Sequence, residues 1–338
     1  MAATRYSRQI LLPEVGPEGQ AKLAAASVLV IGTGGLGCPV LQYLATAGVG
    51  RLGIIDPDRV EESNLHRQIL YTEADLGSPK VVAAARRVRE LNPDCVVETC
   101  QQRLDPALAA EWVGRFDIVV DGTDNFSAKY ALSDACRDQN RPLVSASIQG
   151  FSGYIGCFCG DVPSYRALFP EVPDSAPNCA EAGVLGPTVG FFGLLQASET
   201  LKLILNIGRP LKGQLLRVNL LTLEISTFSF ALAPEPVEQR SLTIPLMDEI
   251  PDDWFVLDVR QPAGFNQSRL PNAYNIPLEQ LAVRGHELPR DQPILVYCQR
   301  GVRSENACRW LLGQGFANVA SLAGGYQRFA ERSSGEVS

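Results

Sequence analysis

The sequence lacks any long apolar segment. The longest apolar stretch among its 338 residues, around Gly183 to Ala197, is interrupted by Pro187 and several glycines. It falls short of the roughly 18 uninterrupted apolar residues that a membrane-spanning helix needs. The first residues, MAATRYSRQILLPE, also lack the apolar core of a signal or transit peptide. We therefore expect a soluble, cytoplasmic protein without a membrane partner.

An excess of positive charge and a regular cysteine framework are both missing. The formal net charge of -7 argues against a general affinity for nucleic acid or anionic membranes. The nine cysteines are odd in number and irregularly spaced, in a chain too large to need disulfides for stability. Reduced thiols, as in the cytosol, are therefore expected.

What the sequence does contain predicts two α/β domains. Short apolar runs alternate with helical segments in the first part, which predicts a mostly parallel sheet with helices on both faces. The strands, all expected to be buried, are 28–31, 52–55, 95–98, 118–120 and 143–145, with helices at 39–47 and 80–91. After Gly150 the pattern is typical of an antiparallel extension, with strands at 154–158, 215–219 and 224–230 and a helix at 189–204.

A stretch rich in Pro and Glu, ALAPEPVEQR at 231–240, predicts a linker between the domains. Beyond it the alternation of strands and helices restarts. We place the first domain at residues 1–230, the linker at 231–245 and a small α/β domain at 246–334.

The segment VLVIGTGGLG predicts a nucleotide-binding turn. Its glycines, Gly32, Gly34, Gly35 and Gly37, follow a predicted strand and precede a helix, whose N-terminus offers free N–H groups to phosphate. Asp56 ends the second predicted strand about 20 residues further on, where a carboxylate can bind ribose hydroxyls. A dinucleotide and ATP fit this pattern equally well.

Charged and polar residues after the next strands favour ATP. The segments SNLHRQ, PKV and DGTDN place Asn64, Arg67, Lys80 and Asp124 where a doubly wound sheet gathers its loops. A nicotinamide cofactor has no need of these groups. A triphosphate under attack needs cations for the developing charge and a carboxylate for Mg²⁺. Taken singly, Arg67 and Lys80 could be surface charges and Asp124 a helix cap.

A lone cysteine near the C-terminus predicts sulfur chemistry. Cys298 follows a predicted strand, and the residues after it lead into a helix: Gln299, Arg300, Gly301, Val302 and Arg303. A thiol surrounded by backbone N–H groups at a helix N-terminus and beside arginines is expected to be a thiolate. The same loop would stabilise the terminal sulfur of a persulfide. Cys308, inside the following helix, is expected in the core.

The ordered motifs RYSRQ, GTGGLG, DPDxVEESNLHRQ, GxPK, DGTDN and CAEAGVLGP resemble those of the adenylating enzymes typified by MoeB and ThiF. The resemblance covers residues 5 to 230 and implies a Rossmann-like fold of the ubiquitin-activating type. It implies ATP bound by the Gly32–Gly37 loop, with Asp56 on the ribose. Asn64, Arg67 and Lys80 would contact the phosphates, Asp124 would hold Mg²⁺ and the reacting carboxylate, and Ser63 and Asn125 would line the site. Family members are dimers in which the arginine at the position of Arg8 reaches the partner's ATP.

Residues 246 to 334 resemble a single rhodanese domain, whose loop CxxGxRS carries the persulfide sulfur. The spacing CxxxxR is one residue shorter than the loop of the related phosphatases, which favours sulfur over phosphate. The two resemblances together imply adenylation of the C-terminal glycine of a ubiquitin-like sulfur-carrier protein with a Gly-Gly end. Sulfur from thiosulfate or a cysteine desulfurase would then pass through Cys298. Cys179 matches a family cysteine proposed to be an acyl or disulfide partner.

The sequence departs from the family at the zinc site. Many members bind a structural zinc through two CxxC pairs, but here Ser164-Tyr165-Arg166-Ala167 replaces the first pair, and residues 220–240 contain no CxxC. Cys157 and Cys159 form only CxC, and their spacing on a strand predicts that both point to one face. Without thiolate ligands we predict no zinc, as in a MoeZ-like subgroup with a fused sulfurtransferase domain.

Other functions remain open at this stage. One is an NAD-dependent oxidoreductase with an appended sulfurtransferase domain. Another is a scaffold that binds ubiquitin-like proteins without activating them, although such scaffolds typically lose the Arg or Lys at the phosphates. A third is a relative that modifies tRNA or a peptide. The fused rhodanese-like part favours sulfur delivery.

Overall fold

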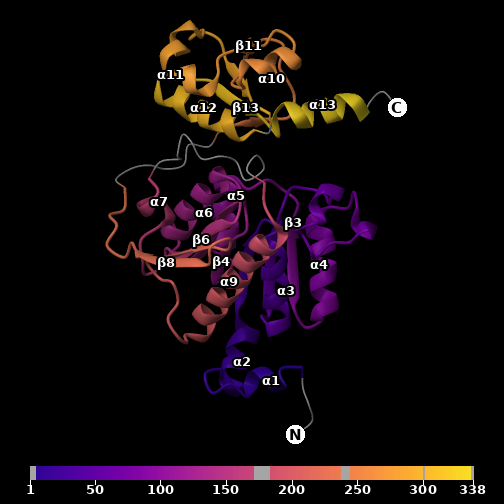
Figure 1. Ribbon diagram of the computed structural model, residues 1–338, viewed down its shortest axis with the longest axis vertical. Coiled ribbons are helices and arrows are strands. Elements are labelled where there is room, and N and C mark those ends of the chain that lie inside the picture. The colour runs from indigo at the N-terminus through magenta and orange to yellow at the C-terminus, as the bar shows by residue number, and fades with distance from the viewer. Residues whose placement is uncertain (1–4, 171–182, 237–243, 300, 336–338) are drawn as a thin grey trace. The chain divides into compact units, whose positions relative to one another are not determined.

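The computed structural model describes residues 5–170, 183–236, 244–299 and 301–335. The chain divides into two compact units, Met1–Ser241 and Leu242–Ser338 (Figure 1). Each unit has its own sheet and its own hydrophobic core. None of the helices in the described ranges is long and apolar enough to cross a membrane.

The first unit is built on an eight-stranded sheet in the order β3-β2-β1-β4-β5-β6-β7-β8. The first five strands in this order are parallel, and β6, β7 and β8 extend the sheet in antiparallel fashion. The predicted fold class is therefore confirmed. The strands are β1 (Ser27–Ile31), β2 (Arg51–Ile55), β3 (Val96–Cys100), β4 (Ile118–Asp121), β5 (Leu143–Gln149), β6 (Ser152–Phe158), β7 (Gln214–Asn219) and β8 (Glu224–Ser229).

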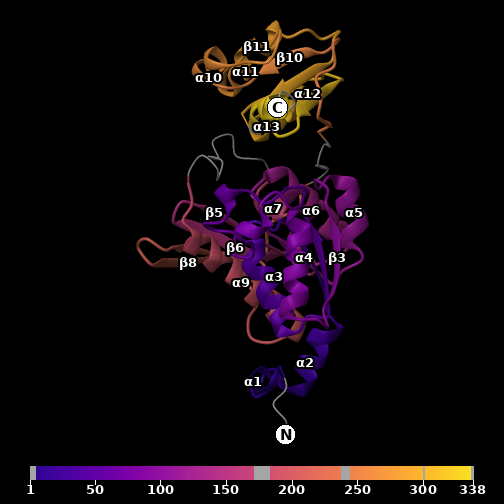
Figure 2. The same cartoon turned by 90° about the vertical axis from the view of Figure 1, so that its right-hand side faces the viewer.

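Helices cover both faces of this sheet. Along β1, Val28 and Val30 join one core cluster while Leu29 and Ile31 join the other, because successive side chains of a strand point to opposite faces. The first cluster lies under α3 (Gly37–Ala47), α4 (Lys80–Leu91) and α9 (Gly186–Leu205), which Figures 1 and 2 show side by side. The second lies under α5 (Pro106–Val113) and α6 (Phe126–Asp138). Shorter helices complete the unit: α1 (Ser7–Ile10), α2 (Gly16–Ala25), α7 (Tyr165–Leu168), η1 (Glu62–Asn64) and η2 (Glu73–Asp75).

Two details of the predicted fold are wrong. We expected the strand near residue 96 to be buried, but β3 is the edge of the sheet and Val96 is 58% exposed. Cys157 and Cys159 do not share a face, because β6 ends at Phe158 and Cys159 has a φ of 59°. Cys157 joins the core cluster of α9, whereas Cys159 joins that of α6.

The second unit holds a five-stranded parallel sheet in the order β11-β10-β12-β13-β9. Its strands are β9 (Leu246–Met247), β10 (Phe255–Asp258), β11 (Tyr274–Asn275), β12 (Ile294–Tyr297) and β13 (Val319–Leu322). Its helices are α10 (Pro262–Gln267), η3 (Leu278–Gln280), α11 (Leu281–Arg284), η4 (Gly285–Glu287), α12 (Val302–Gly313) and α13 (Gly325–Gly335). Ile244, which we placed in the linker, is buried in the core of this unit.

Two glycines of α9 test how tightly this helix packs on α3. A Cβ at Gly190 would meet no atom within 4 Å, whereas a Cβ at Gly193 would lie 2.5 Å from the carbonyl oxygen of Leu36. We expect Gly190→Ala to raise the free energy of unfolding by about 1 kcal/mol, because alanine favours a helix interior over glycine. We expect Gly193→Ala to lower it by about 1–3 kcal/mol through overpacking.

Urea unfolding of the two variants and the parent chain measures both effects. Equal stability of Gly190→Ala and Gly193→Ala would contradict the close packing of α9 against the start of α3.

Candidate functional site

Two glycine-containing loops contact each other, backbone to backbone, at the ends of β1 and β4. Gly32 has a φ of 83°, and a Cβ on it would lie 2.8 Å from the carbonyl oxygen of Gly122. A Cβ on Gly37 would overlap the carbonyl oxygen of Gly32. The strands β1 and β4 are neighbours at the point where the strand order reverses, which is where doubly wound sheets bind ligands.

The start of α3 is open to an anion. The residue before α3, Leu36, provides no side-chain cap. The N–H of Cys38 donates to the carbonyl of Gly34 at 2.9 Å and Pro39 has no N–H, so an anion here would be bound by the N–H groups that precede Cys38. Beyond its two neighbours, Gly34 has one described atom within 4 Å of a Cβ built on it, the Nε2 atom of Gln68 at 3.8 Å. A Cβ built on Gly35 would lie 2.5 Å from Cγ1 of Val189 and 3.5 Å from Cγ of Arg67. The geometry of this turn therefore fits a phosphate.

Asp56 is buried and stabilises the Gly32–Gly37 turn through hydrogen bonds. Its Oδ2 atom accepts hydrogen bonds from the backbone N–H of Thr33 at 2.7 Å and from its hydroxyl at 2.9 Å. Its Oδ1 atom accepts one from the N–H of Asp58 at 2.9 Å. Burial raises the pKa of Asp56. This support of the turn was not predicted, and the ribose contact of Asp56 stays a prediction.

Lys80 is the first residue of α4 and is only 6% exposed. Its Nζ atom lies 3.1 Å from Oδ2 of Asp58. Burial opposes the charge of this amine, but the carboxylates of Asp56, Asp58 and Asp124 together raise the pKa of Lys80. The fold thus keeps a buried cation at this edge of the sheet, within the electrostatic field of Asp124.

The segment from Ser63 to Gln68 lies against the glycine turn. The side chain of Asn64 is buried and bonds the N–H of Glu61 at 3.2 Å and the hydroxyl of Ser63 at 3.3 Å. Arg67 is half-buried, and its Nη1 atom donates to the carbonyl of Ser63 at 2.9 Å. These bonds fix the predicted phosphate-binding residues relative to one another; their contacts with a nucleotide stay predictions.

The loop after β4 is held by a buried ion pair that we did not predict. The Oδ2 atom of Asp121 lies 2.6 Å from Nζ of Lys129, and its Oδ1 atom accepts from the N–H of Thr123 at 3.0 Å. Both charged side chains are almost fully buried. The sequence contains a signal for this ion pair, since Asp121 and Lys129 both belong to the run IVVDGTDNFSAKY. Predicting that they pair would have required knowing that α6 follows the loop directly.

Asp124 is exposed, and it does not cap α6. That role belongs to Asn125, whose Oδ1 atom accepts a hydrogen bond from the N–H of Ala128 at 2.8 Å. Asn125 therefore has a structural function besides the nucleotide contact predicted for it. The carboxylate of Asp124 lies at the end of the loop that contacts the glycine turn.

Arg8 is not brought to the glycine turn of its own chain. The helix that carries it, α1, lies at the far end of α3, where Nε2 of Gln9 donates to the carbonyl of Ala47 at 2.9 Å. The turn is at the other end of this 11-residue helix, about 16 Å away at 1.5 Å per residue. In Figures 1 and 2, α1 and α2 lie at one end of the unit.

Cys38, the cysteine in α3, does not provide a nucleophile near the turn. Cys38 is fully buried, with Sγ 3.3 Å from the carbonyl oxygen of Thr33, and burial raises its pKa to about 12. Cys179 lies outside the described residues, as does Arg300 of the second unit. All eight described cysteines are free thiols.

Cys298 of the second unit lies in a loop that surrounds its sulfur with donors. Its Sγ atom accepts a hydrogen bond from the N–H of Gly301 at 3.1 Å, and the hydroxyl oxygen of Ser304 lies 3.6 Å away. Gly301 has a φ of 99° and precedes α12, so the sulfur lies at the N-terminus of a 12-residue helix. This helix end favours a negative charge on sulfur.

Further residues support the Cys298 loop. Arg260 pairs with Asp258 at 2.7 Å and donates to Oε1 of Gln299 at 3.1 Å. The start of α13 binds the loop from the other side, because the N–H of Tyr326 donates to the carbonyl of Cys298 at 2.8 Å. Ser304 stands in the quoted loop CxxGxRS, but neither its role nor that of Arg260 was predicted. Arg303 is half-buried in the first turn of α12.

Cys308 is fully buried in the core of the second unit, as predicted. Burial raises the pKa of its thiol well above the ordinary value. Cys308 is therefore the inert cysteine of α12.

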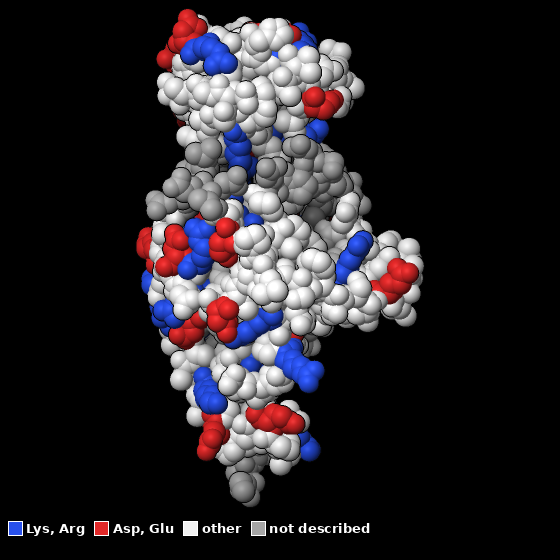
Figure 3. Space-filling view, turned by 90° about the vertical axis from the view of Figure 1, so that its left-hand side faces the viewer, with Lys and Arg blue, Asp and Glu red and all other residues white. Residues whose placement is uncertain are grey.

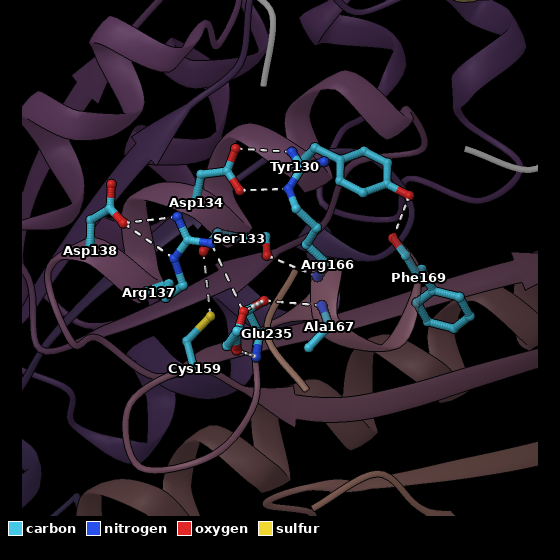
Figure 4. A network of polar contacts seen from close by, with 11 residues as sticks. Tyr130, Ser133, Asp134, Arg137, Asp138, Cys159, Arg166, Ala167, Phe169 and Glu235 are labelled. Carbon is cyan, nitrogen blue, oxygen red and sulfur yellow. Dashed lines mark hydrogen bonds and ion pairs between the residues drawn. The ribbon is translucent and has the colours of Figure 1, made fainter. Parts of the chain in front are cut away.

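A polar network occupies the place where the family's first CxxC pair would stand (Figure 4). Ser164 donates to Glu235 from its N–H at 2.6 Å and from its hydroxyl at 2.7 Å. Arg137 also pairs with Glu235, at 3.9 Å, and Arg166 forms a bidentate pair with Asp134 at 2.8 and 2.9 Å. Within the described ranges no three His, Cys, Asp or Glu residues group as metal ligands. A zinc-free chain stays a prediction.

Charges of both signs are mixed on the face of each unit that Figure 3 draws. On the face drawn in Figure 3, Lys and Arg lie among Asp and Glu rather than in a single basic patch.

Comparison with known proteins identifies both units. The ThiF family matches residues 6–238, and the rhodanese-like domain matches residues 245–332. The sulfur carrier protein adenylyltransferase of Thermus thermophilus is 50% identical over 220 residues, 63% of this chain and 81% of that protein. The probable adenylyltransferase/sulfurtransferase MoeZ of Mycobacterium tuberculosis is 35% identical over 364 residues, 97% of this chain and 93% of that protein. The fold also matches E. coli MccB solved with ATP, at a TM-score of 0.61 and 25% identity over 69% of this chain and 73% of that chain.

Two glycines of the second unit test the loop around Cys298. Gly301 has a φ that side chains rarely adopt, and a Cβ on it would lie 3.4 Å from the N atom of Gly324. We expect Gly301→Ala to lower the rate of sulfur transfer from thiosulfate to cyanide at least about ten-fold, since a strained turn costs about 1–3 kcal/mol. Gly313→Ala, at the end of the same helix with no atom within 4 Å of its Cβ, is the matched control.

Assays of the purified full-length variants measure this difference. Equal rates for Gly301→Ala and Gly313→Ala would show that the backbone of the Cys298 loop does not hold the transferred sulfur.

Proposed function

The chain belongs to the ThiF family and carries a rhodanese-like domain, and from this premise we propose that it activates a ubiquitin-like sulfur-carrier protein. Its first unit adenylates the C-terminal glycine of the carrier with ATP. Its second unit then delivers sulfur from a persulfide on Cys298, so that the carrier leaves with a C-terminal thiocarboxylate.

The chain is a transferase with an adenylyltransferase unit and a sulfurtransferase unit. The full-length relative MoeZ is named for both activities, and the Thermus thermophilus relative is named a sulfur carrier protein adenylyltransferase. Because the Thermus thermophilus relative is named for a sulfur carrier protein, we assign a carrier of the same class as the substrate of this chain. The relatives' activities also favour ATP over a nicotinamide as the ligand of the glycine turn.

The observation that carries the adenylation proposal is the arrangement at the β1–β4 junction. An uncapped helix N-terminus, the buried cation of Lys80 and the exposed carboxylate of Asp124 belong to loops at the same edge of the sheet. A carboxylate that attacks the α-phosphate of ATP expels pyrophosphate, and negative charge builds up on the phosphate oxygens. Lys80 and Arg67 stabilise that charge, because fixed cations in a partly buried site need no reorganisation.

Asp124 is the residue that would hold Mg²⁺. Magnesium is usually bound by one or two carboxylates together with substrate phosphates, and a single exposed carboxylate beside the phosphate turn fits this pattern. When bound, the ion would neutralise part of the triphosphate charge and orient the α-phosphate. Asp124 itself would orient the incoming carboxylate by its position at the end of the loop.

Sulfur transfer completes the reaction at the acyl-adenylate. The terminal sulfur of the Cys298 persulfide attacks the acyl carbon and AMP leaves, which forms an acyl disulfide between carrier and enzyme. A second thiol, for which Cys179 is the candidate, then attacks the Cys298 sulfur. The carrier thiocarboxylate is released and a Cys179–Cys298 disulfide remains for an external reductant. Thiosulfate or a cysteine desulfurase would restore the persulfide on the reduced enzyme.

We also propose that the active form is a homodimer. Arg8 lies on α1, at the far end of α3 from the glycine turn of its own chain. A role for Arg8 at the phosphates therefore requires the site of a second copy.

Carrier-dependent exchange of pyrophosphate into ATP tests the adenylation step. We expect exchange only when a carrier with a C-terminal Gly-Gly is added. Lys80→Met should lower the exchange rate about 100-fold or more, because a fixed cation at the phosphates is lost. Lys22→Met, which changes an exposed lysine on α2, is the control.

Exchange in the absence of any carrier would refute the proposal. A purified protein that absorbs as a bound nicotinamide does would favour the oxidoreductase instead.

A further inference from the structure

Gln68 is a buried side chain at the glycine turn to which the reaction above assigns no part. It is 3% exposed and follows Arg67 directly. Its Oε1 atom is buried and has no hydrogen-bond partner among the residues that the structure describes. Its Nε2 atom lies 3.8 Å from the position of a Cβ built on Gly34.

The backbone, rather than the amide, fixes Gln68 in place. Its N–H donates to the carbonyl of Asn64 at 2.9 Å, and its own carbonyl accepts from the N–H of Tyr71 at 3.1 Å. The hydroxyl of Tyr71 in turn donates to the carbonyl of Thr33 at 2.9 Å. The segment is therefore attached to the glycine turn through Tyr71, three residues after Gln68. Among the described residues the Oε1 atom of Gln68 takes no part in this attachment.

A buried amide carbonyl without a donor lowers the stability of the fold, because the group has lost its hydrogen bonds to water. Such a group in a native structure calls for an explanation. An apolar side chain of the same length would fill the space without that cost. A glutamine at position 68 is explained if its Nε2 atom binds a ligand.

The surroundings of the Nε2 atom indicate the chemistry of that ligand. Apart from the two neighbouring residues, no other atom of the described part of the chain lies within 4 Å of a Cβ at Gly34, so a ligand can approach this glycine closely. The neighbouring Gly35 packs on Arg67, and the uncapped start of α3 follows. All these groups offer hydrogen-bond donors or positive charge, as an amide NH₂ group does. A phosphate, whose oxygens are acceptors, fits them best.

We propose that Gln68 is a further ATP-binding residue, whose Nε2 atom donates a hydrogen bond to a phosphate oxygen of the nucleotide at the Gly32–Gly37 turn. The proposal rests on the ATP site of the proposed function and adds to it a neutral donor between Arg67 and the glycines. A neutral donor positions the phosphate chain without adding to the positive charge that Arg67 and Lys80 supply.

This role predicts opposite effects of one substitution on stability and on binding. Gln68→Met keeps the length of the side chain and removes the unpaired carbonyl, so the midpoint of urea unfolding should stay the same or rise. The same change removes the bond to a charged phosphate, so the dissociation constant for ATP should rise about ten-fold or more. Gln68→Glu should weaken ATP binding further, because a carboxylate repels the phosphates.

The experiment measures urea unfolding of the full chain with increasing ATP, because a ligand that binds only the folded state stabilises it according to its affinity. It needs no carrier protein, so a failure of the carrier proposal would leave this result unaffected. Gln102→Met, which changes an exposed glutamine, is the matched control and should behave like the parent chain. Weaker ATP binding with undiminished stability of Gln68→Met would support the proposal. An unchanged ATP affinity, or a loss of stability without ATP, would overturn it and assign Gln68 to the internal structure.

Discussion

The close packing of three glycine backbones at the junction of β1 and β4 is the constraint on which the first unit depends. Gly37 leaves no room for a side chain beside the carbonyl of Gly32, and Gly32 in turn lies against Gly122. This packing sets the start of α3 and joins it to the loop that leads to Asp124. Asp56 holds the same turn from the side of β2. The site is therefore part of the sheet junction, and its polar groups are positioned before a ligand arrives.

The two units use the same physical device for different atoms. In each, a parallel strand ends in a glycine turn, and a helix begins directly behind it: α3 after β1, and α12 after β12. A helix N-terminus stabilises negative charge. In the first unit the expected charge is on phosphate, and in the second it is on the sulfur of Cys298. The proposed function thus pairs a site for the phosphates of ATP with a site for an attacking sulfur anion.

Much of this architecture could be predicted, because each strand is a short apolar run bounded by turn residues, and the motifs fix which loops meet. The edge position of β3 could not, since it depends on the strand order. The cap on Asn125 and the pair of Asp121 with Lys129 depend on where α6 begins. The lack of a hydrogen-bond partner for the side-chain Oε1 atom of Gln68 among the described residues depends on packing, which no sequence pattern predicts.

The most direct test of the account is the mass of a Gly-Gly-ended carrier after incubation with the enzyme, ATP, thiosulfate and a reductant. The parent chain and Cys308→Ala should both replace one oxygen of the carrier by sulfur. Cys298→Ala should leave the carrier without sulfur while it still supports pyrophosphate exchange. Sulfur transfer by Cys298→Ala would contradict the central claim that one chain activates the carrier and supplies its sulfur.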